Sequence, residues 1–185
     1  MHKIHITEGL VLRKRGVNEA NTLVWILTPE FGLIRAQARS TRVVQSKLRY
    51  GIEALTEGRY ALVQGKHEWR LTGAEAYQRL RPTAALGRVT ALLLRLVNGE
   101  EAHPDLYKSV MEGFSLLAEA DAVHSDALET VLVLRILSHL GYLPETPTLA
   151  QFVEGGISLE LSAKALQSRN MLIRTINESL SATGL

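Results

Sequence analysis

The chain has 185 residues, of which 46% are hydrophobic and 22% charged, and it contains no cysteine. This composition excludes a disulfide scaffold, a thiolate metal site and a cysteine nucleophile, and its apolar fraction is too high for a disordered chain. The 21 Lys and Arg residues nearly balance the 19 Asp and Glu residues, but residues 1–80 carry a net charge of +6 and the remainder −4. A basic half joined to an acidic half suggests that the first binds a polyanion, although chance clustering on a solvated surface explains the charge equally well.

The first 80 residues favour β-structure. Residues 22–28 are rich in β-branched and aromatic side chains, and Pro29-Glu30-Phe31-Gly32 follows as a turn. From residue 33 to 39 apolar and polar residues alternate, so Ile34, Ala36 and Ala38 should face a core while Arg35, Gln37 and Arg39 face water. The expected strands are Ile4–Arg13, Thr22–Thr28, Leu33–Arg39, Arg59–Gly65 and Glu68–Glu75. Five short strands and one longer basic loop, 40–51, fit a closed barrel of the oligonucleotide/oligosaccharide-binding (OB) type better than a sandwich.

After Arg81-Pro82 the apolar spacing becomes helical. Thr83 is a candidate N-cap for the first helix, and Asp126 with Glu129 has the spacing of a capping box for the third. The expected helices cover about 83–98, 103–120, 126–140 and 162–181, with a short extended piece at 157–161. The third helix is apolar on too many faces for a surface position, so we expect it at the centre of its domain. The fold class is therefore α+β: an OB-fold nucleic-acid-binding domain at residues 1–80 and a helical domain at 81–185.

The sequence offers no positive evidence for catalysis. Gly65-Lys66 is followed by His67 and lacks the spacing of a phosphate-binding loop. On a strand, His2 and His5 would point to opposite faces and could not share a metal ion. The N-terminus lacks the apolar core of a signal peptide, and no uncharged run approaches the roughly 18 residues that span a bilayer. We expect a cytoplasmic, non-enzymatic protein without cofactors.

Several short motifs, in order, resemble the DNA repair protein RecO family of recombination mediators. They are Glu8–Arg13, Glu19 before Leu23–Thr28, Thr28–Ile34, Arg35–Arg39, Ser46–Leu48, Gly73–Glu75 and Leu137–Pro144. The resemblance implies a protein that binds single- and double-stranded DNA, anneals complementary strands and helps load recombinase. It also implies a RecR-type partner and the tail of single-strand-binding protein. Many members of the family carry a four-cysteine zinc site after the Leu-Gly-Tyr-x-Pro turn, and we expect that module to be absent here.

The residues themselves agree with DNA binding, because barrels of this type follow phosphates with a basic groove. The predicted DNA-binding residues are Arg13, Lys14, Arg15, Arg35, Arg39, Arg42, Lys47 and Arg49. The first three are expected to leave the first strand together, and the last three to line the long loop. The family usually has Gly and two basic residues where this chain has Ser40–Arg42. Trp25 and Trp69 lie in alternating strands and are expected in the core rather than as stacking platforms.

Two other functions remain open. The chain could be an adaptor whose helical domain docks an acidic or apolar peptide tail while the barrel only anchors it. It could also be an RNA-binding OB-fold protein associated with translation. The DNA affinity of the barrel separates the first alternative from DNA binding, and competition between DNA and RNA of one sequence separates the second.

Overall fold

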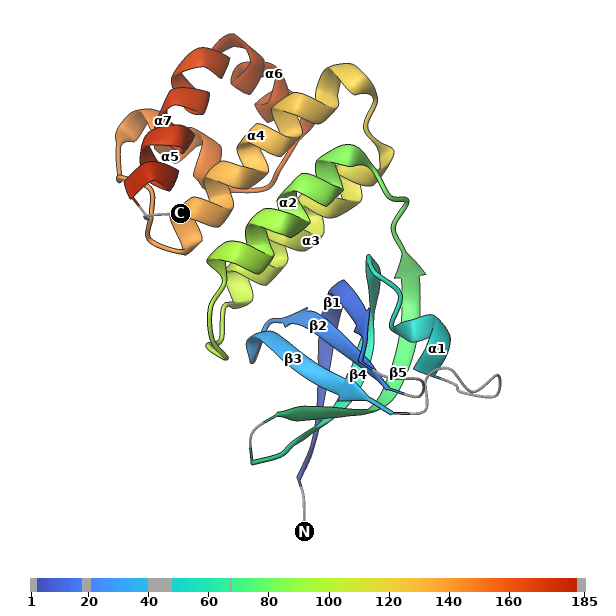
Figure 1. Cartoon of the computed structure of the whole chain (residues 1–185). Coiled ribbons are helices and arrows are strands. Elements are labelled where there is room, and N and C mark those ends of the chain that lie inside the picture. Colours follow the sequence, from blue (N-terminus) through green and yellow to red (C-terminus); the bar gives the residue numbers. More distant parts are fainter. Residues whose placement is uncertain (1–2, 18–20, 40–47, 67, 183–185) are drawn as a thin grey trace. The chain divides into compact units, whose positions relative to one another are not determined.

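The computed structural model describes residues 3–17, 21–39, 48–66 and 68–182, apart from the side chains of Arg49 and Leu159. The chain forms two compact units (Figure 1). One contains residues 1–81 together with 96–104, and the other contains residues 82–95 and 105–185. The first unit holds the five strands and one short helix, and the second holds six helices of the described chain.

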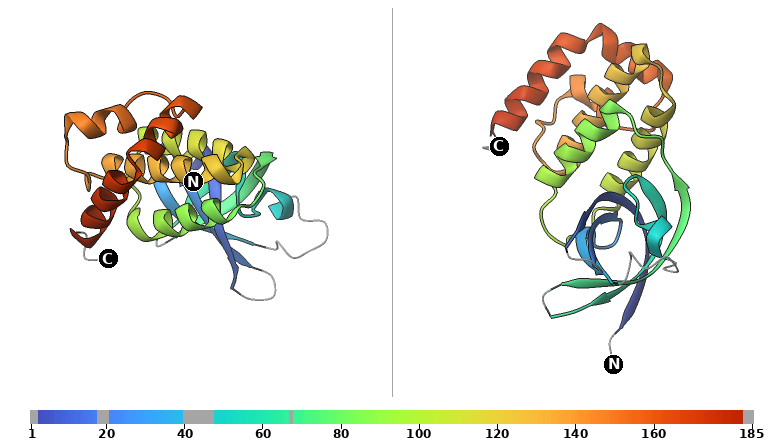
Figure 2. Two further views of the ribbon diagram at one scale, coloured as in Figure 1. Left: turned by 90° about the horizontal axis from the view of Figure 1, so that it is seen from above. Right: turned by 45° about the vertical axis from the view of Figure 1, so that its right-hand side comes forward.

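The first unit is a closed barrel, which confirms the predicted fold class. Its strands are β1 (Ile4–Gly16), β2 (Thr22–Thr28), β3 (Gly32–Ala38), β4 (Thr56–Gln64) and β5 (Trp69–Arg79). They close in the order β1-β2-β3-β5-β4, and only the β3–β5 pair is parallel. The turned view shows the curved strands closing around a common interior (Figure 2). Helix α1 (Leu48–Gly51) follows β3 in the chain, and the Tyr60 hydroxyl donates to the Gly51 carbonyl at 3.0 Å.

The barrel core arises from strict alternation along the strands. In β3, Ile34, Ala36 and Ala38 are fully buried while Arg35 is exposed, as the sequence predicted. Trp69 is 2% exposed and lies in the same core, so its predicted core position is also confirmed. Burial of these apolar side chains is the main stabilising contribution to the barrel, at about 25 cal/mol per Å² removed from water.

The turn between β2 and β3 depends on one glycine. Gly32 has φ +62°, a conformation that other residues adopt only with strain. A Cβ atom at this position would also lie 2.3 Å from the carbonyl oxygen of Glu101. The His103 amide donates to the Pro29 carbonyl at 3.2 Å in the same turn. Segment 96–104 therefore packs directly on the β2–β3 turn.

Helix α4 is the centre of the helical unit, as predicted. The helices are α2 (Ala84–Leu96), α3 (Pro104–Glu119), α4 (Ala122–His139), α5 (Pro147–Val153), α6 (Leu159–Gln167) and α7 (Arg169–Ala182). Helix α4 contacts α5, α6 and α7. Glu129 in α4 pairs with Arg88 of α2, and Leu132 packs where α3 has Gly113, too close for a larger residue.

Arg135 of α4 is buried in this unit and only 2% exposed. Its guanidinium donates hydrogen bonds to the carbonyls of Phe152, Glu154, Gly155 and Gly156. Burial lowers the pKa of Arg135 from its ordinary value. A charged group can be buried here because carbonyl oxygens replace the water it loses. The chain after α5 is thereby fixed to the central helix.

Four features of the helical unit differ from the prediction. Helix α4 begins at Ala122 with Asp121 as its N-cap, not at Asp126. Helix α5 was not expected, and Ser158 caps α6 where a short extended piece was predicted. The last predicted helix is two helices, α6 and α7.

Candidate nucleic-acid interface

The outward side of β1, β2 and β3 carries a row of three side chains in register. Trp25 of β2 lies opposite Arg13 of β1 and opposite Arg35 of β3. Residues directly opposite one another in antiparallel strands project from the same face of the sheet. Both arginines are exposed and Trp25 is partly buried. The Arg13 guanidinium carbon lies 5.3 Å from the centre of the indole ring, within the range of a cation–π contact.

A bulge in β1 places Arg13 on this side. Val11 pairs with Ile26 in the core, and the register shifts before Arg13 pairs with Trp25. Leu12 is therefore an extra residue with no partner in the ladder. In a regular strand without this bulge, Arg13 would face the same way as Val11, into the barrel, because side chains alternate along a strand. The bulge thus turns a cation outward beside an aromatic ring.

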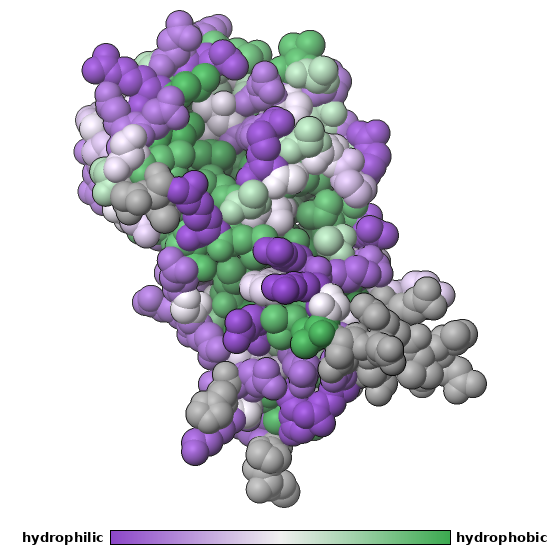
Figure 3. Space-filling model, in the orientation of Figure 1, coloured by the Kyte–Doolittle hydropathy of each residue, from purple (hydrophilic) through white to green (hydrophobic). Residues whose placement is uncertain are grey.

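A second row lies one step further along the same strands. Arg15, Leu23 and Gln37 are in register across β1, β2 and β3, and Gln37 is paired with Arg70 of β5. Arg39 follows the end of β3, and its Nε lies 3.4 Å from the Gln37 side-chain oxygen. The two rows make one outward basic face, which we call the arginine face: Arg13, Arg15, Arg35, Arg39 and Arg70 with Trp25. Figure 3 shows strongly hydrophilic residues on the barrel, at the bottom of the view.

No acid in the described part of the chain neutralises the arginine face. Among the residues that the structure describes, none of its five arginines forms an ion pair with a carboxylate. Lys14, between Arg13 and Arg15, differs: it is in register with buried Val24 and pairs with Glu53. Five guanidiniums on one surface, without a carboxylate partner among the described residues, create a positive potential that attracts a polyanion.

The other side of the barrel has the opposite character. Glu8, Arg59 and Glu75 form a row across β1, β4 and β5, and Arg59 donates to Glu75 at 2.7 Å. Tyr77 donates to Glu8 at 2.9 Å. The hydrogen bond from Arg59 to Glu75 raises the pKa of Arg59, and burial, followed by the bond to Glu8, raises the pKa of Tyr77. The row of Glu8, Arg59 and Glu75 carries a net negative charge, unlike the arginine face, so the barrel is electrostatically two-sided.

The predicted site residues have different positions in the fold. Arg13, Arg15, Arg35 and Arg39 come together on the arginine face, although the first two lie within β1 and do not leave it as predicted. Arg42 and Lys47 lie outside the described residues, and Arg49 lies in α1 with its side chain outside them.

Two members of the arginine face were not predicted from the sequence. Arg70 alternates with buried Trp69 and Leu71, so its outward position could have been inferred from the pattern. Trp25 was expected in the core, but it is in register with two exposed arginines. Its outward position follows from Val24 and Ile26, which are both fully buried on the other side of β2.

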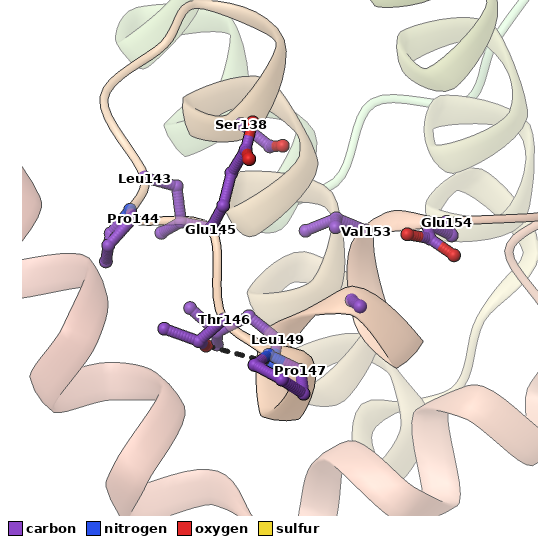
Figure 4. Close-up of a pocket in the computed structure, with 10 residues that line it drawn as sticks. Ser138, Leu143, Pro144, Glu145, Thr146, Pro147, Leu149, Val153 and Glu154 are labelled. Carbon is purple, nitrogen blue, oxygen red and sulfur yellow. Dashed lines mark hydrogen bonds between the residues drawn. The ribbon is translucent and has the colours of Figure 1, made fainter.

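The helical unit contains a pocket of about 530 Å³ next to the end of α4 and α5. Leu143, Leu149 and Val153 contribute apolar surface, and Glu145 and Glu154 contribute carboxylates (Figure 4). The two carboxylates disfavour the acidic peptide of the adaptor hypothesis, because like charges repel.

A serine and a histidine lie within hydrogen-bond distance elsewhere in this unit. Ser109 Oγ is 2.9 Å from His139 Nε2, and the pair links α3 to α4. Ser109 is only 7% exposed and lies within a helix, which gives a substrate little access to its hydroxyl. We assign the pair to packing between the two helices.

No group of three or more His, Asp or Glu side chains in the described part is placed to hold a metal ion. None of the described helices combines the length and the apolar character needed to cross a membrane.

Comparisons with known proteins match both units. The family described as "Recombination protein O N terminal" matches residues 1–79, and "Recombination protein O C terminal" matches residues 78–147. The chain is similar to the DNA repair protein RecO of Heliobacterium modesticaldum, with 30% identity over 77% of this chain and 54% of that protein. It is 27% identical to RecO of Dehalococcoides mccartyi over 75% of this chain and 57% of that protein. It is 25% identical to RecO of Exiguobacterium sibiricum over 88% of this chain and 68% of that protein. The chain thus spans about half the length of the first two relatives.

Proposed function

Because the chain belongs to the RecO family, we propose that it is a DNA-binding recombination mediator, which anneals complementary strands and assists recombinase loading during repair. The observation that carries this proposal is the arginine face, with five guanidiniums that pair with no described carboxylate. Arginine binds phosphate through a planar fork of donors and keeps its charge at all physiological pH values. Such contacts follow the backbone and do not depend on base sequence.

The two-sided barrel supports a mechanism for annealing. A strand bound on the arginine face loses part of the charge that repels its complement, so two bound or adjacent strands approach at lower electrostatic cost. The acidic row Glu8, Arg59 and Glu75 does not attract DNA, so the strand stays on one side with its bases available for pairing. Neither step uses nucleotide hydrolysis or a metal ion.

The test is an annealing assay with two complementary labelled strands and the full chain. Annealing should rise above the spontaneous rate, with and without single-strand-binding protein, and adding a chelator or omitting nucleotide should leave it unchanged. An annealing rate equal to that without protein contradicts the proposal. Competition with RNA of the same sequence tests the RNA-binding alternative: stronger competition by RNA than by DNA would favour it.

The partners are part of the proposal. We propose that the full chain binds a RecR-type protein and the tail of single-strand-binding protein, and that it acts in the cytoplasm. Co-sedimentation of the full chain with each purified partner tests the two contacts. An Arg35→Ala Arg39→Ala variant should bind both partners as the unchanged protein does, because both substitutions lie on the arginine face.

A further inference from the structure

Trp25 is an unusual residue to find on a charged outward surface. The chain has two tryptophans, and the other, Trp69, is 2% exposed within the barrel core. Trp25 instead lies on the outward side of β2, partly buried, with exposed arginines in register on both sides. An indole in this position is stabilised less by burial than a core indole, so its position calls for another contact.

The two arginines lie on the strands on either side of Trp25. Neighbouring strands are about 4.8 Å apart, so the backbone positions of Arg13 and Arg35 are about 10 Å apart with Trp25 between them. Arg13 lies over the ring, and Arg35 has no ion pair in the described chain. The long arginine side chains can move off the indole to a phosphate, which leaves a flat aromatic surface between two cations.

We propose that Trp25 is a stacking platform for one unpaired base of a single strand, while Arg13 and Arg35 bind the phosphates on either side of that base. This inference rests on the proposed function and adds a substrate preference to it. The base must expose its flat face to stack on the indole, and within a duplex both faces of each base are covered. The platform therefore gives single strands an advantage over duplex, whereas phosphate contacts alone bind both forms.

The experiment uses the full chain with Trp69→Phe, so that Trp25 is the only fluorescent indole. Trp69→Phe keeps an aromatic side chain in the core, and circular dichroism checks its fold. Addition of an oligothymidylate should quench Trp25 emission, and a duplex of equal length should quench it less at equal saturation. In a parallel measurement of affinity for the oligothymidylate, Trp25→Leu should weaken binding about 5- to 150-fold, the range for loss of one stacked base. Trp25→Phe should recover part of that loss.

Tyr77→Leu is the matched control, since Tyr77 is an exposed aromatic residue of β5 that bonds to Glu8, outside the arginine face. It should leave affinity unchanged. If the folded Trp25→Leu protein binds the oligothymidylate as tightly as the unchanged protein, and no quenching occurs, the platform is wrong while DNA binding stands. If the unchanged protein binds no DNA at all, the proposed function itself is wrong.

Discussion

Replacing Arg35 and Arg39 by alanine should halve the salt dependence of single-strand binding without unfolding the protein. Both side chains are exposed and neither pairs with a described carboxylate, so their removal leaves no buried acid unpaired. They are four residues apart along β3 and its continuation, about 13 Å at roughly 3.3 Å per residue. One bound strand could therefore contact both.

The magnitude follows from counting phosphate contacts. If Arg13, Arg15, Arg35 and Arg39 each neutralise one phosphate, the log–log slope of affinity against salt is about −2.8, at about 0.7 per contact on single strands. The double variant should have a slope of about −1.4. A fourfold rise in salt then weakens the unchanged protein about 50-fold and the variant only about 7-fold.

The assay is fluorescence anisotropy of a labelled oligothymidylate over a series of salt concentrations. Arg59→Ala with Arg79→Ala is the control, because it removes the same charge from exposed positions on β4 and β5. The control should keep the slope near −2.8. Equal slopes for both variants, with both shown to be folded by circular dichroism, would mean that binding follows total charge and that the arginine face has no special role.

Three further predictions concern stability. Ile34→Asp should unfold the barrel, because Ile34 is fully buried and the new carboxylate would have no partner; far-ultraviolet circular dichroism detects the loss. Arg135→Ala leaves four carbonyls without their donor and should lower the free energy of unfolding by about 3 kcal/mol in urea denaturation; a change within experimental error would contradict a stabilising role for these hydrogen bonds. Asp121 caps α4, and its hydrogen bond from the His124 backbone lowers the pKa of the carboxyl. Its stabilising contribution should be complete above about pH 4 and lost as the pH falls through that lowered pKa. Asp121→Asn should show a weaker acid dependence of the thermal midpoint than the unchanged protein. The same acid dependence in both proteins would refute a stabilising role for the charged Asp121 carboxylate at the start of α4.

The sequence predicted the barrel well because each strand has one buried side and one wet side. Residues 32–38 show this most clearly, with alternating burial along the whole strand. The Thr83 cap was also predictable, since its hydroxyl accepts from the Leu86 amide at 3.2 Å, as a local capping pattern requires. Signals of this kind depend on neighbours in the chain, and a single sequence contains them.

Features that depend on distant neighbours were missed. Asp126 and Glu129 have capping-box spacing, yet Glu129 pairs with Arg88 of another helix, and Asp121 is the cap. The outward position of Arg13 depends on a register shift against β2, which the β1 sequence alone does not show. The bulge decides which side chains belong to the candidate site, so the site was less predictable than the fold.

The barrel unit is discontinuous in sequence, because segment 96–104 returns to it after helix α2. A fragment that ends at residue 81 would lack the Glu101 carbonyl packed beside Gly32 and the His103 amide bonded to Pro29. The unit thus cannot be excised, or exchanged with a relative as a gene cassette, by a single cut at the end of β5. Any exchange must transfer two separate stretches of coding sequence together.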